Sequence, residues 1–163
     1  MVTRITAGAF LSCGDRVLLM KRGLHKELGP GLWAGVGGHM DLQDIKNPRA
    51  LELAETCYRE VEEETGIKRT QIRGLALRYM VVSRAETEIR IVYHYFGEVE
   101  EEISPPKCEE GEFFWINKED ALNRPMSASV KEAIKHWVAN PGSEDIYFIC
   151  VNKADDSAVI TQI

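Results

Sequence analysis

Three glutamates lie close together in one predicted helix, where their side chains could share a metal ion. Glu60, Glu63 and Glu64 stand at i, i+3 and i+4, positions that gather on one face of a helix. Like charges at i,i+4 repel by roughly 0.2–0.5 kcal/mol per pair, and the helix dipole disfavours negative charge near a C-terminal end. A hard divalent cation would make the arrangement favourable, because magnesium prefers carboxylate oxygens, water and phosphates. The alternative is a glutamate-rich face that meets only solvent.

The negative charge of the chain is concentrated around these glutamates. The net charge is −6, and the window Leu51–Ile67 alone contributes −5, which leaves −1 for the rest of the 163 residues. A surface for duplex nucleic acid should be basic, so the charge argues against that partner and favours a cation. The longest apolar runs reach about half a dozen residues, far below the roughly 20 that span a bilayer. We therefore expect no membrane segment and, since Asp15 and Arg16 interrupt the first apolar run, no signal peptide and a cytoplasmic protein.

A glycine pair lies upstream of the glutamates and could contact the same ligand. Gly37 and Gly38 follow a strand-like segment, and glycine lets the backbone approach a ligand closely. The downstream segment 59–67 reads Arg-Glu-Val-Glu-Glu-Glu-Thr-Gly-Ile. This segment resembles the C-terminal half of the Nudix box, whose pattern is Gly, five residues, Glu, seven residues, then Arg-Glu-apolar-x-Glu-Glu-x-Gly-apolar. Every fixed position of that half is matched, and Gly38 supplies the opening glycine.

The spacing inside the box departs from the family pattern. The family places the arginine fourteen positions after the opening glycine, whereas Arg59 follows it by twenty-one, so seven residues are extra. If the surplus follows the loop, Asp44 takes the position of the first glutamate as a shorter acid. If the surplus precedes it, Leu51 takes that position and the acid is missing, unless the neighbouring Glu52 serves. We prefer the first alternative, because Pro48 would then begin a helix about two turns longer at its N-terminal end.

The resemblance implies a reaction as well as a fold. Nudix proteins typically hydrolyse a nucleoside diphosphate linked to another moiety, using magnesium or manganese. The chain is thus expected to be a metal-dependent pyrophosphohydrolase with Mg²⁺ or Mn²⁺ as cofactor. The favoured substrate is a nucleoside triphosphate, oxidised or not, cleaved to monophosphate and pyrophosphate. The alternatives are another diphosphate, such as a nucleotide sugar, and a non-catalytic nucleotide-sensing module with the same fold. The expected partner is a small nucleotide or related diphosphate, and a homodimer is compatible with the sequence.

Matching positions in the family imply roles for individual residues. Glu60, Glu63 and Glu64 would be metal ligands, together with the backbone carbonyl of Gly37. Arg59 would orient the glutamates by a charge-assisted hydrogen bond, so that Arg59, Glu60 and Glu63 form the catalytic set, with Glu63 a candidate general base.

A further acid outside the box is expected to join the metal site. In some relatives a loop glutamate before the late aromatic strand is a metal ligand, and Glu110, five residues before Trp115, resembles it in placement. Glu109 and Glu112 compete for this role, and an exposed acidic loop without a metal is the alternative.

The substrate-binding residues are the least constrained. Trp33 and Trp115 could stack on a base, although aromatic residues on strands also build cores. Gly38 would approach the substrate with its backbone, and Lys21 would reach a phosphate. Other basic residues that could do so are Arg22, Arg78 and Arg90.

The elements that must position these residues indicate an α/β protein. Strands are predicted at Thr6–Leu11, Val17–Lys21, near Trp33, Leu75–Val82, Glu88–Val99, Phe113–Ile116 and Ile146–Val151. Helices are predicted from Asn47 to Gly66, from Asn117 to Leu122, and from Ser127 or Ser129 to near Val138. No linker or repeat divides the chain, so residues 1–163 should form a single Nudix-like hydrolase domain. The expected architecture is a Nudix-like α/β/α sandwich with a mixed β-sheet.

Overall fold

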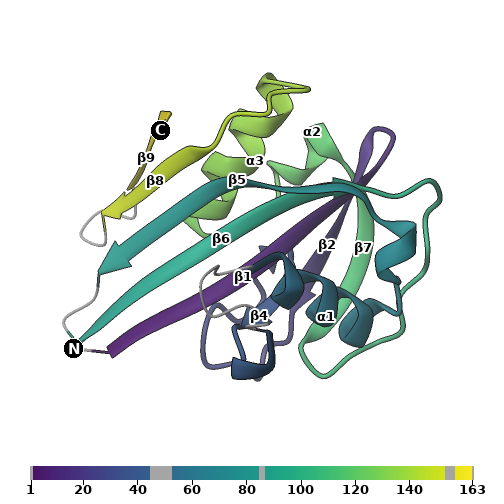
Figure 1. The fold of residues 1–163 in the computed structure, drawn as a ribbon, viewed down its shortest axis with the longest axis horizontal. Coiled ribbons are helices and arrows are strands. Elements are labelled where there is room, and N and C mark those ends of the chain that lie inside the picture. Colours follow the sequence, from purple (N-terminus) through teal and green to yellow (C-terminus); the bar gives the residue numbers. More distant parts are fainter. Residues whose placement is uncertain (1, 45–52, 85–86, 153–156, 163) are drawn as a thin grey trace.

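A mixed β-sheet runs through the middle of the protein (Figure 1). The computed structural model describes residues 2–44, 53–84, 87–152 and 157–162. The strands in these ranges are β1 (Val2–Cys13), β2 (Arg16–Arg22), β3 (Trp33–Ala34), β4 (Val36–His39), β5 (Arg73–Arg84), β6 (Glu88–Glu98), β7 (Gly111–Asn117), β8 (Tyr147–Asn152) and β9 (Ser157–Gln162). Their order is β3-β2-β1-β6-β5-β8-β9, while β4 pairs with β1 and β7 pairs with β2.

Strand β1 organises the sheet because it has three neighbours. It runs parallel to β6 along most of its length, from the pair Val2 and Glu88 to the pair Ser12 and Glu98. Its other edge is shared, since residues 6–9 pair with β4 and residues 11–13 pair with β2, both antiparallel. The fork brings the glycines of β4 to the middle of β1.

Helices cover both faces of the sheet. The helical segments are η1 (Leu42–Asp44), α1 (Leu53–Thr65), η2 (Arg69–Gln71), α2 (Lys118–Ala121) and α3 (Ala128–Ala139). Helix α1 buries Cys57 and Val61 against one core, which contains Ala9 from β1. Helix α3 packs on a second core, which contains Phe10. Since neighbouring strand residues point to opposite faces, the two helices lie on opposite sides of the sheet, and the predicted α/β/α sandwich is confirmed.

Helix α1 ends where the sequence predicts. Gly66 adopts a left-handed φ of 74°, and its N–H donates to the carbonyl of Glu62 at 2.9 Å, as in a glycine-terminated helix. The predicted start at Asn47 and Pro48 lies outside the described residues. The buried face of α1 carries Cys57 and Val61 one turn apart.

The remaining elements differ from prediction mainly in length. Ser127 caps α3 by accepting the N–H of Val130 at 3.4 Å, which selects it over Ser129. The predicted strands are present, and most extend by one or more residues because neighbouring strands continue the pairing. Strands β4 and β9 were not predicted, since glycines obscure the pattern of the first and β9 alternates only weakly. None of the helices in the described ranges combines the length and apolar character that a bilayer span requires.

Candidate functional site

A cavity of about 590 Å³ lies beside the glutamates of α1. It is of the size that small-molecule sites usually have. One end is formed by residues from β4, α1 and the segment before β7, and we call this the acidic cavity end: Gly37, Gly38, Glu60, Glu64 and Glu110. Residues of β1 and β6 line much of the rest, together with Ser127, Ser129 and Val130 at the start of α3. The chain thus brings together five residues that the sequence analysis selected.

Glu60 lies directly against the backbone of Gly38. A Cβ atom at Gly38 would stand 2.3 Å from Oε1 of Glu60, so any larger residue there would displace the Glu60 carboxylate from this position. Burial raises the pKa of Glu60, while the adjacent Arg59 opposes this shift. The close approach explains why a glycine opens this segment.

Glu64 is the least satisfied polar group at this end. Its Oε2 atom is buried and has no hydrogen-bond partner within the described ranges. Burial raises the pKa of Glu64 to about 7, and the negative charges of Glu60 and Glu110 add to the effect. A buried carboxylate without a partner is costly, and a bound cation would relieve both the burial and the repulsion.

Glu110 reaches the cavity from the segment before β7. Its Oε1 accepts from Nζ of Lys26 at 2.5 Å, and its Oε2 lies 4.0 Å from Nη2 of Arg22. The backbone carbonyl of Glu110 accepts the N–H of Gly23 at 2.9 Å. The loop is thus tied to the segment that follows β2.

Arg59 is held by a second group of polar contacts, which we call the Arg59 cluster: Arg59, Asp44, Thr56 and Glu63. Nε and Nη2 of Arg59 donate to the two carboxylate oxygens of Asp44 at 2.9 and 3.0 Å. Nη1 donates to Glu63 at 3.1 Å and lies 2.9 Å from Oε1 of Glu60. The sequence-predicted contact between Arg59 and the glutamates is therefore present, and its effect on catalysis stays a prediction.

Asp44 is buried and fully paired. In addition to Arg59, Oδ2 accepts from Thr56 Oγ1 at 3.0 Å and from the backbone N–H of Asp41 at 2.9 Å. The hydrogen bond from Arg59 holds the pKa of Asp44 at about 2. The Asp44 carboxylate is thus engaged by Arg59 and does not line the cavity, and its place as the first acid of the box stays a prediction.

The acids are not gathered as a preformed metal cage. Among the described residues, no three His, Cys, Asp or Glu side chains already stand close enough to hold a metal ion. Glu63 is exposed and directed to Arg59, and it is not among the residues that line the cavity. The donors nevertheless fit a hard cation, because Glu60, Glu64 and Glu110 are carboxylates at one cavity end, and Oε2 of Glu64 has no hydrogen-bond partner among the residues described.

Three of the predicted substrate-binding residues lie elsewhere. Trp33 is 7% exposed and packs in the core that contains Phe10. Trp115 donates its indole N–H to the carbonyl of Ile103 at 2.8 Å. Neither tryptophan nor Lys21, which is exposed on β2, is among the residues that line the cavity. Both tryptophans pack with the cores and Lys21 lies outside the cavity, whereas Arg22 at the end of β2 lines it. The substrate-binding roles of Trp33, Trp115 and Lys21 stay predictions.

Several cavity residues escaped the sequence analysis. Gly8 and His94 line the cavity from β1 and β6, as do Arg4 and Arg90, of which only Arg90 was named as a candidate. Both arginines contact the same carboxylate, that of Glu88. Arg90, Val92 and His94 alternate along β6, so the sequence does indicate that their side chains share one face of the strand. The tyrosines on the other face make that other face the stronger candidate for a functional surface.

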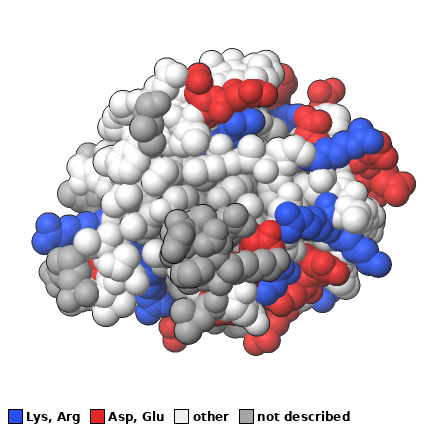
Figure 2. All heavy atoms as spheres, viewed as in Figure 1, with Lys and Arg blue, Asp and Glu red and all other residues white. Residues whose placement is uncertain are grey.

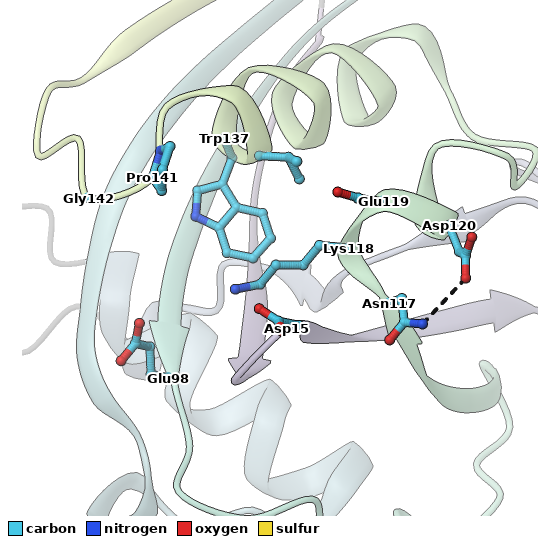
Figure 3. A pocket seen from close by; sticks show the side chains of 10 residues that line it. Asp15, Glu98, Asn117, Lys118, Glu119, Asp120, Trp137, Pro141 and Gly142 are labelled. Atoms are coloured by element: carbon cyan, nitrogen blue, oxygen red, sulfur yellow. Dashed lines mark hydrogen bonds between the residues drawn. The ribbon is translucent and has the colours of Figure 1, made fainter.

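A second cavity of about 760 Å³ lies by α2 and α3 (Figure 3). Lys118 extends along the Trp137 ring there, with Nζ 4.7 Å from the ring centroid, and Asp15 and Glu98 line the same cavity. None of the predicted site residues lines this cavity. Figure 2 shows acidic and basic side chains intermixed at the end of the molecule that carries α1, without a continuous basic surface over the described residues of this face.

Comparisons with known proteins agree with this geometry. The NUDIX domain family model matches residues 2–138. A MutT mutator protein from Bacillus halodurans superimposes with a TM-score of 0.71 at 21% identity, covering 98% of this chain and 97% of that one. A NUDIX hydrolase from Alicyclobacillus acidocaldarius gives 0.72 at 17% identity, covering 88% and 95%. The E. coli dihydroneopterin triphosphate pyrophosphohydrolase gives 0.64 at 18% identity, covering 86% and 99%. A search of curated proteins found no match.

The family match and the fold together define a hydrolase of phosphoanhydride bonds. The chain belongs to the NUDIX domain family, whose model spans most of its length. The predicted family and its fold are confirmed.

Proposed function

We propose that the protein is a metal-dependent pyrophosphohydrolase that cleaves a nucleoside triphosphate to a monophosphate and pyrophosphate. The observation that carries this proposal is the buried, unpartnered Oε2 of Glu64 beside Glu60 and Glu110 in one cavity. The charge and chemistry of this end suit a cation that in turn attracts phosphate oxygens. The name of the E. coli structural neighbour, a triphosphate pyrophosphohydrolase, is consistent with this substrate class.

The chain's residues would divide the work between binding and positioning. Glu60, Glu64 and Glu110 would hold Mg²⁺ or Mn²⁺, with the Gly37 carbonyl and Glu63 as the further ligands implied by the family. A bound cation neutralises phosphate oxygens and acidifies a coordinated water. Arg59 keeps Glu60 in place through its contact with Oε1.

The reaction consumes one water for each anhydride bond. The water oxygen bonds to one phosphorus of the anhydride between the α and β phosphates, and the bridging P–O bond on that phosphorus breaks. The bridging oxygen leaves on the other product, and a carboxylate accepts the proton of the water. Glu63 is the base that the box implies, and it would have to turn from Arg59 to act. Phosphoryl transfer needs mainly positioning and charge stabilisation, which this cavity end provides.

The decisive experiment replaces Glu64 and follows pyrophosphate release. Glu64→Gln keeps the shape of the side chain and removes its charge, so kcat with nucleoside triphosphates and Mg²⁺ should fall about 10³-fold. Glu62→Gln is the matched control, because Glu62 lies on the same helix and is exposed. Its turnover should equal that of the wild type.

Two results would contradict the proposal. If Glu64→Gln releases pyrophosphate as fast as Glu62→Gln, the acidic cavity end does not carry the chemistry. If the wild type cleaves nucleotide sugars but no nucleoside triphosphate under the same conditions, the substrate class is wrong.

A further inference from the structure

His94 is a buried histidine with no partner for either ring nitrogen. It is 5% exposed, and both Nδ1 and Nε2 lack a hydrogen bond within the described part of the chain. His136 shows the usual arrangement, since its Nδ1 lies 3.1 Å from the hydroxyl of Tyr79. Because buried polar groups are nearly always hydrogen-bonded, the two orphaned nitrogens of His94 indicate that a partner is missing.

The position of His94 connects it to the acidic cavity end. Gly37 on β4 pairs with Gly8 on β1, and Gly8 pairs with His94 on β6. All three residues line the same cavity. Two strand spacings separate Gly37 from His94, which amounts to about 10 Å. A ligand whose phosphates lie beside Glu60 and Glu64 would therefore place its distal group over β6.

Gly8 keeps the floor of the cavity free of side chains beside the imidazole. A Cβ atom at Gly8 would lie 3.7 Å from Nδ1 of His94 and 3.8 Å from the carbonyl oxygen of Val36. Both are ordinary van der Waals distances, so packing of the protein does not demand a glycine. Because Gly8 has no side chain, the cavity extends to the Nδ1 atom of His94.

The walls around His94 suit a planar aromatic group. Phe10 meets the imidazole edge-on, with ring centroids 5.3 Å apart and an interplanar angle of 78°. Val92 and Val130 line the cavity with them. Burial lowers the pKa of His94 to about 4, so the ring is neutral near pH 7. A neutral imidazole offers one N–H donor and one nitrogen acceptor.

These properties match a nucleobase better than a sugar or a bare phosphate. A base has flat apolar faces and an edge that carries both donors and acceptors. We propose that His94 is a specificity-determining residue that hydrogen-bonds the base of the nucleotide whose phosphates lie at the acidic cavity end. This inference rests on the proposed function and assigns to it a base-reading position.

The test compares a nucleotide with the same molecule lacking its base. Turnover of the common nucleoside triphosphates is measured against ribose 5-triphosphate, with Mg²⁺, for the wild type and His94→Phe. The variant fills the volume without hydrogen-bonding, so kcat/KM for the preferred nucleoside triphosphate should fall about tenfold, mainly through KM. Turnover of ribose 5-triphosphate should not change. His136→Phe is the control, because His136 is not among the cavity-lining residues, and it should leave the ratio of the two substrates unaltered.

A second variant guards against a folding effect at His94. Gly8→Ala fits the packing of the chain but narrows the space beside Nδ1, so it should raise KM for the nucleoside triphosphate more than for ribose 5-triphosphate. If both His94→Phe and Gly8→Ala leave the substrate ratio at the wild-type value, His94 is only a buried core residue and the inference is wrong.

Direct binding separates this inference from the proposed function. In ¹⁵N-histidine-labelled wild-type protein, the His94 ring nitrogens should shift on addition of a nucleoside monophosphate but not of ribose 5-phosphate. Such a shift without any triphosphate hydrolysis would reject the proposed reaction and keep the base site. Hydrolysis without such a shift would keep the reaction and reject the base site. Absence of both would reject both.

Discussion

Asp44 precedes helix α1 and Glu64 lies near the C-terminal end of that helix. The surroundings of these two carboxylates are opposite. Asp44 accepts hydrogen bonds from Arg59, Thr56 and a backbone N–H. Glu64 has an oxygen that is buried without any partner within the described ranges. Accordingly the pKa of Asp44 is lowered to about 2, and the pKa of Glu64 is raised to about 7.

The difference separates groups that stabilise the protein from groups that await a ligand. In a fully paired buried carboxylate, the hydrogen bonds offset the free energy lost when the group leaves water. An unpaired one is tolerated only where something outside the chain completes it. Asp44 is thus a carboxylate whose partners lie within the protein, whereas the acidic cavity end has the unpartnered carboxylate oxygen on which the proposed function rests.

The largest expected effect on stability follows from removing the Asp44 carboxylate from the Arg59 cluster. Asp44→Ala leaves the guanidinium of Arg59 without its bidentate partner, so the free energy of unfolding should fall by about 3 kcal/mol. Urea denaturation measures this. Asp41→Ala is the control, since Asp41 is exposed and 3.8 Å from Arg59, and it should cost less than about 1 kcal/mol. If Asp44→Ala and Asp41→Ala lower the free energy of unfolding equally, the hydrogen bonds of Asp44 do not stabilise the protein as argued.

Gly38→Ala should damage the acidic cavity end and spare stability. The new methyl group would collide with the carboxylate of Glu60. The carboxylate would then have to move away from β4. We expect kcat to fall about 10²-fold, or about 2.7 kcal/mol in activation free energy, with an almost unchanged urea midpoint. A second substitution, Glu60→Asp, shortens the acid and should restore part of the activity. A Gly38→Ala enzyme with wild-type kcat would contradict this placement of Glu60.

The two carboxylates should give pH dependences of opposite sign in metal-free protein. The pKa of Glu64 is raised from 4.5 to about 7, so its contribution is fully present below 4.5 and is lost as pH rises to about 7. The pKa of Asp44 is lowered from 3.8 to about 2, so its contribution is present above 3.8 and is lost as pH falls to about 2. Thermal unfolding across pH, with Glu64→Gln and Asp44→Asn as references, should reveal each slope as a difference from the wild type. The same slope in wild type and variant would refute the corresponding assignment.

Metal binding should stabilise the wild type through Glu64. At ten times the dissociation constant, Mg²⁺ or Mn²⁺ adds about 1.4 kcal/mol to the free energy of unfolding, which corresponds to a rise of about 4 °C in Tm. Differential scanning fluorimetry with and without EDTA measures it. Glu62→Gln should keep the rise and Glu64→Gln should lose it. A rise that persists in Glu64→Gln would place the metal elsewhere.

Glu63→Gln should have the smallest effect on stability. Glu63 is exposed, and its ion pair with Arg59 spans one helical turn, which is worth about 0.3–0.5 kcal/mol. Chemical denaturation should therefore show almost no change. Its kcat is the informative quantity, because a loss of tenfold or more would support the proposed role of Glu63 as metal ligand or base. Unchanged kcat would assign Glu63 to the Arg59 cluster alone.

Much of the architecture was predictable because local patterns govern it. Strands β1 and β2 follow from short apolar runs, β6 from alternation of apolar residues, and the buried face of α1 from apolar residues at helical spacing. Gly66 ends the helix through its left-handed φ. The weak strand β4 was not predictable, because its pairing with β1 depends on a partner distant in the chain.

The sequence by itself determined the family, the acidic segment 59–67 and the sandwich of helices on a mixed sheet, because spacing along a single element is encoded locally. Only the tertiary structure decided which acids face the cavity, that Trp33 and Trp115 do not line it, and that His94 shares it with Glu60 and Glu64. The physical reason is that burial and hydrogen-bond partnership depend on neighbours brought together across β4, β1 and β6. The parallel pairing of β1 with β6 joins residues more than eighty positions apart, and no local pattern records that contact.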